Sequence, residues 1–189
     1  MDVNYWSLRY QKEQTGWDIG EASRPLVQLF KEFEDKEAKI LIPGCGNAYE
    51  AEYLFNEGYQ NVYLIDMAKE PLNDFIKRNP NFPSDQILFG DFFKHIGSYD
   101  IIVEQTFFCA INPNLRTLYV DKCHELLNHK GRILGVLFNR DFEGGPPFGG
   151  SINQYVPLFK QKFSNVKFEY SKYSIEPRSG SEVVFSCEK

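Results

Sequence analysis

The chain lacks the long apolar runs and dense basic blocks that mark two large protein classes. No apolar run approaches the ~20 residues of a membrane-spanning helix. Lysine and arginine are interleaved with acidic residues, and the net charge is −5. Because a nucleic-acid binder usually carries a basic face, we expect neither nucleic acid nor a membrane as a partner.

Cysteines are few and scattered. Cys45, Cys109, Cys123 and Cys187 form no C-x-x-C motif and have no neighbouring histidine pair, so no structural zinc site or other metal site is expected. The first residues contain no basic region followed by an apolar core. We therefore expect no signal peptide and a cytoplasmic protein whose thiols stay reduced.

Two phosphate-binding motifs are also missing. The chain has no G-x-x-x-x-G-K-[ST] sequence, and its glycine turn lacks the third glycine of G-x-G-x-x-G because Tyr49 stands there. In dinucleotide-binding folds that glycine allows close helix–strand packing beside the pyrophosphate. Its absence argues against NAD or FAD, although an NAD(P)-binding Rossmann oxidoreductase stays open as an alternative.

The most informative feature present is a glycine turn followed by an acidic residue. The apolar run 40–42 leads into Gly44 and Gly46, and Asp66 ends the next apolar run twenty residues later. Glycine allows backbone to approach a ligand closely, and an acid at the end of the following strand accepts hydrogen bonds from ribose hydroxyls. This pattern favours a nucleoside-containing cofactor, and the acidic surroundings favour a cationic centre over a phosphate.

The order of apolar segments predicts an α/β fold in one domain of 189 residues. Repeated strand–helix units imply a mostly parallel sheet with helices on both faces, a three-layer sandwich. The last two strands have no helix between them, so we expect an antiparallel hairpin at one edge of a seven-stranded sheet. The expected helices are 24–33, 49–57, 71–78, 115–127 and 152–163, and the expected strands are 39–42, 61–65, 86–89, 99–103, 132–138, 166–173 and 181–187.

Ligands in such sheets bind beyond the carboxyl ends of the strands. Besides the glycine turn, three strand ends there carry an acid, namely Asp66, Asp91 and Glu104. Any one of them could be an ordinary helix cap, but three in one crevice favour a ligand. The other residues expected at this edge are Met67, Phe92 and Gln105.

The motifs along the chain resemble those of the thiopurine and thiol S-methyltransferases, a branch of the class I S-adenosylmethionine-dependent methyltransferases with a Rossmann-like fold. The resemblance covers nearly the whole sequence. Its most specific parts are Thr-Phe-Phe-Cys-Ala-Ile at 106–111 and Gly-Gly-Pro-Pro-Phe at 144–148, and its other parts are 5–6, 15–18, 43–46, 90–93, 112–113 and Arg116.

This resemblance implies a role for each matching residue at the cofactor. It places Trp6, Tyr10 and Trp17 on an N-terminal segment, within residues 1–34, that closes over the site; Trp6 and Trp17 could equally be core anchors. It places Gly44 at the methionine part, Asp66 at the ribose, Asp91 and Phe92 at the adenine, and Gln105 beside the cofactor. Plant relatives often show tryptophan at position 10 and tyrosine at 105, which leaves the acceptor open.

For the methyl acceptor, the resemblance places Arg116 at the acceptor pocket, where it would bind an anion or lower the pKa of a thiol. Phe138 and Phe148 are candidates for its wall, and Asp18 for a polar contact. We expect in-line methyl transfer from S-adenosylmethionine to a small soft nucleophile (a thiol, thiopurine or halide-like acceptor) by a monomer. A non-catalytic S-adenosylmethionine-binding module stays open as a second alternative.

Overall fold

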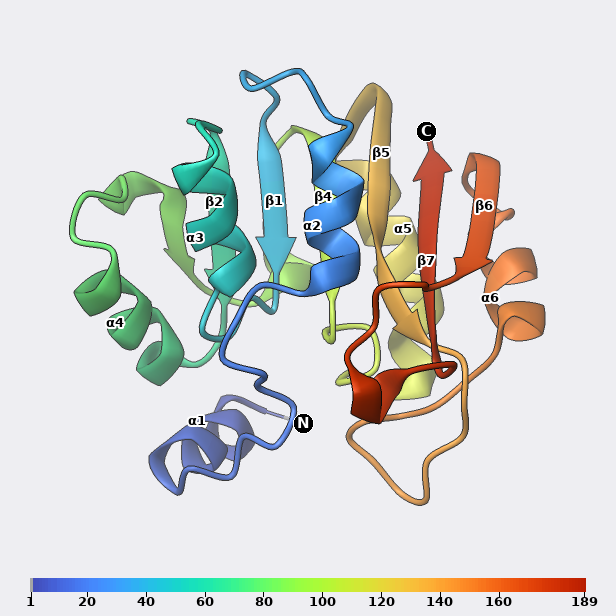
Figure 1. Cartoon of the computed structure of the whole chain (residues 1–189), viewed down its shortest axis with the longest axis horizontal. Helices are drawn as coiled ribbons and strands as arrows, with labels where there is room; N and C mark the ends of the chain where they lie inside the picture. Colours follow the sequence, from blue (N-terminus) through green and yellow to red (C-terminus); the bar gives the residue numbers. More distant parts are fainter. Residues whose placement is uncertain (1) are drawn as a thin grey trace.

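The computed structural model describes residues 2–189, which form one seven-stranded sheet with helices on both faces (Figure 1). The strands lie in the order β3-β2-β1-β4-β5-β7-β6. Their bounds are β1 Ile40–Pro43, β2 Val62–Asp66, β3 Ile87–Phe89, β4 Tyr99–Gln105, β5 Leu127–Phe138, β6 Ser164–Tyr170 and β7 Glu182–Glu188. The helices are α1 Val3–Gln11, α2 Arg24–Lys31, α3 Tyr49–Asn56, α4 Lys69–Arg78, α5 Arg116–Leu126 and α6 Ile152–Phe159.

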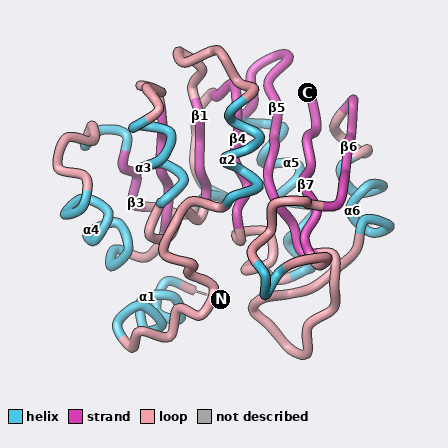
Figure 2. Tube along the Cα trace, in the orientation of Figure 1, coloured by secondary structure: helices cyan, strands magenta, loops and turns pink. Residues whose placement is uncertain are grey.

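Strands β1 to β5 pair in parallel, and β7 pairs antiparallel with both β5 and β6 (Figure 2). The expected fold is thus confirmed, with one refinement in the hairpin. The last strand lies inside the sheet between β5 and β6, so only β7 runs against the other strands. Short 3₁₀ helices connect the elements at Ser84–Gln86, Phe92–Lys94, Pro113–Leu115 and Glu176–Arg178, the last of which is η4.

Two hydrophobic clusters sandwich the sheet. One face packs against α2, α3 and α4 through side chains such as Leu26, Leu54 and Phe75. The other face packs against α5 and α6 through side chains such as Tyr119 and Phe159. All four residues of β1 are buried, as a central parallel strand covered on both faces requires.

Several elements differ from the sequence-based expectation, most clearly at α1, β5 and α6. Helix α1 was not indicated, because it buries no residue and so has no apolar stripe; the side chain of Asp2 caps it by accepting from the backbone N–H of Tyr5. Residues 128–131, which separate the expected helix 115–127 from the expected strand 132–138, lie within β5, whose first residue, Leu127, pairs with Tyr99 across an irregular register. Helix α6 ends at Phe159, and residues 160–162 form a turn.

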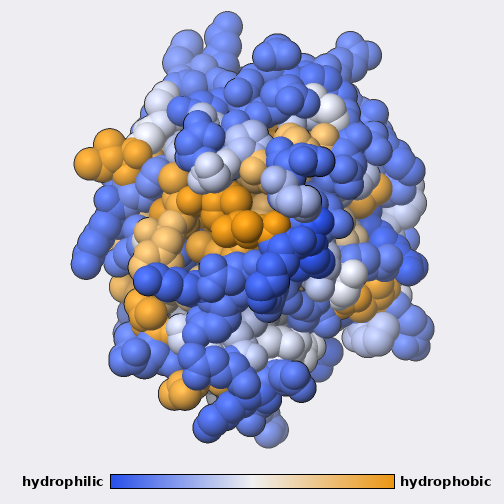
Figure 3. Space-filling model, turned by 90° about the vertical axis from the view of Figure 1, so that its left-hand side faces the viewer, coloured by the Kyte–Doolittle hydropathy of each residue, from blue (hydrophilic) through white to orange (hydrophobic). Residues whose placement is uncertain are grey.

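The parallel strands end at the edge of the sheet where α1 lies, and the loop after β5 reaches the same edge (Figure 1). Three parts of the chain that are far apart in the sequence therefore meet at this edge: helix α1, the ends of the parallel strands and the loop after β5. Seen from the side of β3 and α4, the surface is mostly hydrophilic, with apolar residues gathered in a recess (Figure 3). No helix within residues 2–189 is both long and apolar enough to cross a bilayer.

Candidate active site

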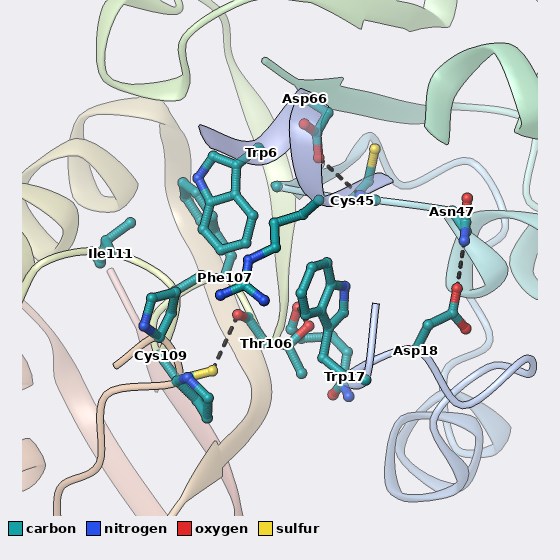
Figure 4. Close-up of a pocket in the computed structure, with 18 of the residues that line it drawn as sticks. Trp6, Trp17, Asp18, Cys45, Asn47, Asp66, Thr106, Phe107, Cys109 and Ile111 are labelled. Atoms are coloured by element: carbon teal, nitrogen blue, oxygen red, sulfur yellow. Dashed lines mark hydrogen bonds between the residues drawn. The ribbon is translucent and has the colours of Figure 1, made fainter. Parts of the chain in front are cut away.

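A cavity of about 680 Å³ lies beyond the carboxyl ends of the strands (Figure 4). Its wall comes from the glycine turn after β1, the ends of β2, β3 and β4, the N-terminal segment and the loop after β5. Twelve of the fourteen site residues expected from the sequence line it: Trp6, Tyr10, Trp17, Asp18, Gly44, Gly46, Asp66, Met67, Asp91, Phe92, Gln105 and Phe138. Arg116 and Phe148 do not.

The glycine turn needs glycine for two reasons. Gly44 and Gly46 have φ of +58° and +52°, a region that residues with a Cβ rarely adopt. A Cβ on Gly44 would also lie 2.2 Å from Cδ2 of Phe107. The ring of Phe107, from the turn after β4, therefore packs directly on the backbone after β1, and this contact joins two neighbouring strand ends.

Asp66 connects the ends of β1 and β2. Its Oδ2 accepts from the backbone N–H of Gly46 at 2.9 Å, and its Oδ1 accepts from that of Ala68 at 2.8 Å. The residue is 9% exposed. Burial raises the pKa of this carboxyl, while the N–H groups of Ala68 and Gly46 oppose the rise. Each carboxylate oxygen keeps acceptor capacity, so Asp66 can bind donors that enter the cavity.

The end of β3 adds a second carboxylate and an aromatic ring. Asp91 caps the following 3₁₀ helix by accepting from the backbone N–H of Phe93 at 2.9 Å, and its side chain is one-third exposed. Phe92 is buried, and its ring meets that of Phe107 edge-on at 5.4 Å between centroids. The capping interpretation of Asp91 is correct, and the residue lines the cavity as well.

The third acid, Glu104, does not line this cavity. It is completely buried at the end of β4, where its Oε1 accepts from the backbone N–H of Phe108 at 2.8 Å and its Oε2 from the hydroxyl of Tyr119 at 2.5 Å. Burial raises the pKa of Glu104 to about 7. Its neighbour across the sheet is Gly135, on which a Cβ would lie 2.2 Å from the Glu104 carbonyl oxygen. Glu104 therefore supports the turn 106–109 from beneath, and the expectation of three acids in one crevice is wrong.

The N-terminal aromatic residues line the cavity instead of anchoring the core. The rings of Trp6 and Tyr10 each meet that of Trp17 edge-on, at 5.6 Å and 5.8 Å between centroids. None of the three is fully buried. Burial and, second, the nearby Asp66 carboxylate raise the pKa of the Tyr10 phenol. This side chain is therefore neutral, and its hydroxyl lies against the glycine turn at Gly46.

Asp18 holds the N-terminal segment to the glycine turn. Its Oδ1 accepts from the backbone N–H of Gly20 at 2.7 Å, and its Oδ2 accepts from the side-chain amide of Asn47 (Figure 4). The carbonyl of Asn47 in turn accepts from Arg78 at 2.5 Å. Asp18 thus lines the cavity at its cofactor end, where it holds the N-terminal segment in place. The sequence predicted a polar contact with the acceptor for Asp18 and did not predict this structural role.

The two residues missing from the cavity wall are bound to each other. One Nη of Arg116 donates to the carbonyl oxygens of Phe148 and Gly149, at 3.0 Å and 2.9 Å, and its guanidinium lies over the ring of Phe108 at 4.7 Å. Phe148 also donates its backbone N–H to the carbonyl of Cys109 at 2.6 Å. In this structure Arg116 and Phe148 therefore lie outside the cavity wall, and the Arg116 guanidinium fixes the Gly/Pro-rich loop.

Sequence reasoning missed several residues of the wall. Arg9, Cys109, Arg140, Phe142 and Arg178 all line the cavity. Arg178 comes from the polar turn between β6 and β7, and nothing in its local sequence marks it as a site residue. Cys109 lies within the recognised segment 106–111 and Arg140 shortly before the segment 144–148, but only the path of the loops brings their side chains to this wall.

Two features of the wall bear on its chemistry. Burial raises the pKa of the Cys109 thiol to about 12, so the sulfur is not a thiolate near neutral pH. The side-chain oxygen of Gln105 is buried and has no hydrogen-bond partner among residues 2–189. A buried acceptor without a partner is costly, so this oxygen favours a ligand that brings a donor. No cluster of three or more metal-binding side chains occurs in the described part of the chain.

Comparison with known proteins agrees with this arrangement. A family model described as thiopurine S-methyltransferase matches residues 1–189. The Arabidopsis thaliana protein named "Probable thiol methyltransferase 2" is 26% identical over 184 residues, which covers 94% of this chain and 81% of the relative. The thiopurine S-methyltransferase of Photobacterium profundum is 24% identical over 177 residues, 84% of this chain and 83% of the relative.

Solved structures show the same fold. A 1,6-didemethyltoxoflavin-N1-methyltransferase from Burkholderia thailandensis, with S-adenosylhomocysteine bound, has a TM-score of 0.75 and 16% identity and covers 99% of this chain and 86% of that one. Magnesium protoporphyrin IX methyltransferase from Synechocystis, also with S-adenosylhomocysteine, has a TM-score of 0.75 and 8% identity, with coverage of 99% and 97%. Because the sequence identity is so low, the likeness concerns the fold alone, which is that of class I methyltransferases.

Proposed function

The chain belongs to the thiopurine S-methyltransferase family, and we propose that its acceptor is a small soft nucleophile: a thiol, a thiopurine or a halide-like anion. Membership makes the protein an S-adenosylmethionine-dependent methyltransferase. The observation that carries the proposed acceptor is that one continuous cavity joins the glycine turn and Asp66 to a wall of Phe138, Arg140 and Arg178.

The cofactor end of the cavity fits an adenosyl sulfonium. Asp66 offers acceptor capacity for a ribose diol, and the unpartnered oxygen of Gln105 offers another acceptor. Asp91 and the ring of Phe92 stand side by side after β3, where they suit the exocyclic amine and the flat face of adenine. The glycine turn supplies no cradle of lysine and backbone N–H groups for a pyrophosphate, so a cationic ligand suits this end better than a dinucleotide.

On this basis we assign the residues that would hold S-adenosylmethionine. Gly44 and Gly46 border the methionine part, Asp66 and Met67 the ribose, Asp91 and Phe92 the adenine, and Gln105 lies beside them. Trp6, Tyr10 and Trp17 cover the site from the N-terminal segment. Ring faces attract a cation by ~0.5–2 kcal/mol, and an aromatic cover excludes water from the reacting groups.

When bound, S-adenosylmethionine supplies an electrophilic methyl group next to a good leaving group. The protein's own task is then to hold the acceptor in line at about 3–3.5 Å. A thiol with a pKa of ~8.5 provides some thiolate at neutral pH, so no strong base is required. Arg140 places positive charge on the acceptor wall, which favours an anionic form of the acceptor, whereas the charge of Arg178 is paired with Glu182.

The Cys109 thiol is not the nucleophile in this proposal. Burial keeps it protonated at neutral pH, and it donates to the carbonyl of Thr106 at 3.1 Å. It contributes a polarisable, neutral surface next to Phe138, which suits a sulfur or a heavy halide better than a hard oxygen anion.

Three broader properties belong to the same proposal. The chain functions as one methyltransferase domain in which residues 1–34 form the closing segment and its following helix. It acts as a cytoplasmic monomer on a small molecule. The pairing of the N-terminal segment with the strand ends of the same chain supports a site that needs no second copy.

An assay with S-adenosylmethionine and a panel of aliphatic thiols, thiopurines, iodide and small phenols tests the proposed acceptor. We expect turnover with a sulfur or iodide acceptor and little with phenols. Turnover with phenols alone would contradict the soft-acceptor proposal. Binding of S-adenosylmethionine without any turnover would favour a non-catalytic module, and binding of NADH in its place would favour an oxidoreductase.

A further inference from the structure

The N-terminal segment, residues 3–23, is held to the rest of the molecule by few interactions. Helix α1 buries none of its residues completely. The segment's hydrogen bonds to more distant parts of the described chain include those of Gln11 with Glu70, Asp18 with Asn47, Ser23 with Glu50, and Trp17 with Arg178. Segments with little buried apolar surface open most easily, so these few bonds decide where the segment lies.

Arg178 differs from the other partners in its place in the fold. Asn47, Glu50 and Glu70 lie in or next to α3 and α4, on the cofactor side of the cavity. Arg178 lies in η4, before β7, on the acceptor side, and donates from Nη2 to the carbonyl oxygen of Trp17 at 2.8 Å. Among the described residues it alone binds the segment from that side. Trp17 and Asp18, adjacent in sequence, are thus held from opposite sides of the cavity.

The guanidinium of Arg178 is itself fixed from the sheet. Its Nη1 lies 3.4 Å from Oε1 of Glu182, the first residue of β7, and the two side chains are 12% and 4% exposed. The guanidinium also lies over the ring of Phe138, 5.5 Å from its centroid. Desolvation makes a buried ion pair weak evidence for stability, and its best-attested use is to specify geometry. Here it gives the Trp17 carbonyl a rigid point of attachment at the acceptor wall.

We propose that Arg178 is a positioning residue that acts through Trp17, by fixing the acceptor-side end of the N-terminal segment across the cavity. This rests on the proposed function in one respect, namely that the wall formed by Phe138 and Arg178 receives the acceptor. Loss of the Arg178–Trp17 bond then frees Trp17 from the acceptor wall, while the Asp18–Asn47 bond still holds the segment over the cofactor end.

The chain provides its own reporter for this test. Its two tryptophans, Trp6 and Trp17, both lie in the N-terminal segment, so the intrinsic tryptophan fluorescence reports on that segment alone. The first measurement is acrylamide quenching of the full-length protein without any ligand, for the wild type and for Arg178→Gln, Arg178→Lys and Arg140→Gln. Arg140→Gln is a matched control, because Arg140 lines the same cavity but lies over Phe142 and not on Trp17.

We expect quenching to increase in Arg178→Gln, to increase less in Arg178→Lys, which keeps one cationic donor, and to stay at the wild-type level in Arg140→Gln. Wild-type quenching in both Arg178 variants would overturn the proposal. Circular dichroism shows whether each variant is folded. If Arg178→Gln does not fold, Arg178→Lys against wild type decides in the same way.

The second measurement separates the two ends of the cavity. We expect Arg178→Gln to lower kcat/KM for the acceptor about tenfold to a hundredfold, as misplacement of a positioning group does, with partial rescue in Arg178→Lys. The Kd of S-adenosylhomocysteine should change much less. An equal loss in kcat/KM for the acceptor and in affinity for S-adenosylhomocysteine would contradict a role of Arg178 at the acceptor end alone. If the wild type itself binds no S-adenosylhomocysteine, the proposed function fails, while the ligand-free quenching result still decides the role of Arg178.

Discussion

The two ends of the cavity are built from different kinds of structure. At the cofactor end, the wall residues directly follow β1, β2 and β3, and backbone hydrogen bonds such as Gly44 N–H to the Ile65 carbonyl fix them to the sheet. At the acceptor end, the wall comes from the segment around Trp17, the loop after β5 and the turn before β7. The first end is a property of the sheet itself, whereas the second depends on where three connecting segments run.

This difference predicts that backbone changes at the cofactor end have the largest effects. In Gly44→Ala, the added Cβ would meet the ring of Phe107 at 2.2 Å, at a φ of +58°. Left-handed backbone costs ~1–2 kcal/mol per residue with a Cβ, and overpacking adds ~1–3 kcal/mol. We expect the free energy of unfolding to fall by about 3 kcal/mol, with loss of cofactor binding, as measured by urea denaturation and calorimetry.

A matched control separates the two causes. Gly20 also has positive φ, +74°, but nothing lies within 4 Å of the position of its Cβ. Gly20→Ala should therefore lose only the backbone part, about 1 kcal/mol. Equal losses in the two variants would mean that the contact between Phe107 and the glycine turn has no energetic role.

The second prediction concerns Asp66, the carboxylate at the end of β2 that also binds the turn after β1. Asp66→Asn removes the charge and keeps one acceptor oxygen, which can serve the N–H of either Gly46 or Ala68 but not both in the present geometry. A charge-assisted hydrogen bond contributes ~1.5–3 kcal/mol, so S-adenosylhomocysteine should bind roughly thirtyfold more weakly by calorimetry. Asp74→Asn, at an exposed pair with Lys77 on α4, serves as the control. Unchanged affinity in Asp66→Asn would remove this residue from the ribose site.

The part of the structure that could be predicted from the sequence follows the same division between the cofactor end and the acceptor end of the cavity. The seven strands and the order of helices could be read from apolar segments and turns, because a parallel sheet buries its strands on both faces. Gly44, Asp66 and Asp91 could be placed in the cavity because a residue after a parallel strand can only lie at one edge. These predictions use local sequence, and local sequence determines the cofactor end.

The acceptor end could not be predicted in this way. Arg116 and Arg178 are both arginines after a turn, and only the path of the chain decides that the first binds the loop carbonyl of Phe148 while the second reaches the cavity. Glu104 was misplaced for another reason. The apolar run 99–103 predicted that Glu104 follows its strand as Asp66 ends its own, but β4 continues to Gln105, so Glu104 lies within the strand and its side chain is in the core.

The third prediction uses Glu104, which supports the turn that joins the two ends. Its pKa in the folded protein, about 7, lies above the unfolded value of 4.5, so its contribution to stability is fully present below pH ~4.5 and is lost as the pH rises through 7. The unfolding free energy of the wild type should fall by about 1–2 kcal/mol more than that of Glu104→Gln between pH 5 and pH 7.

Urea denaturation at the two pH values measures this difference. Asp66 and Glu50 also have pKa values raised by burial, so the wild type alone does not isolate the effect, whereas the comparison with Glu104→Gln does. The glutamine can still accept from the N–H of Phe108 and donate to the oxygen of Tyr119. A parallel fall in wild type and variant would show that Glu104 ionises normally.

The smallest expected effect gives the sharpest test of whether the cofactor end and the acceptor end of the cavity are independent. Asp18→Asn keeps an acceptor for the N–H of Gly20 but weakens the bond to Asn47 at the cofactor end. One charged hydrogen bond with partial exposure contributes about 1 kcal/mol, so the KM for S-adenosylmethionine should rise about fivefold, with little change in the KM for the acceptor. Arg178→Gln should show the opposite pattern. If each substitution instead shifts both constants equally, the N-terminal segment moves as one rigid unit, and the two ends of the cavity are not independent.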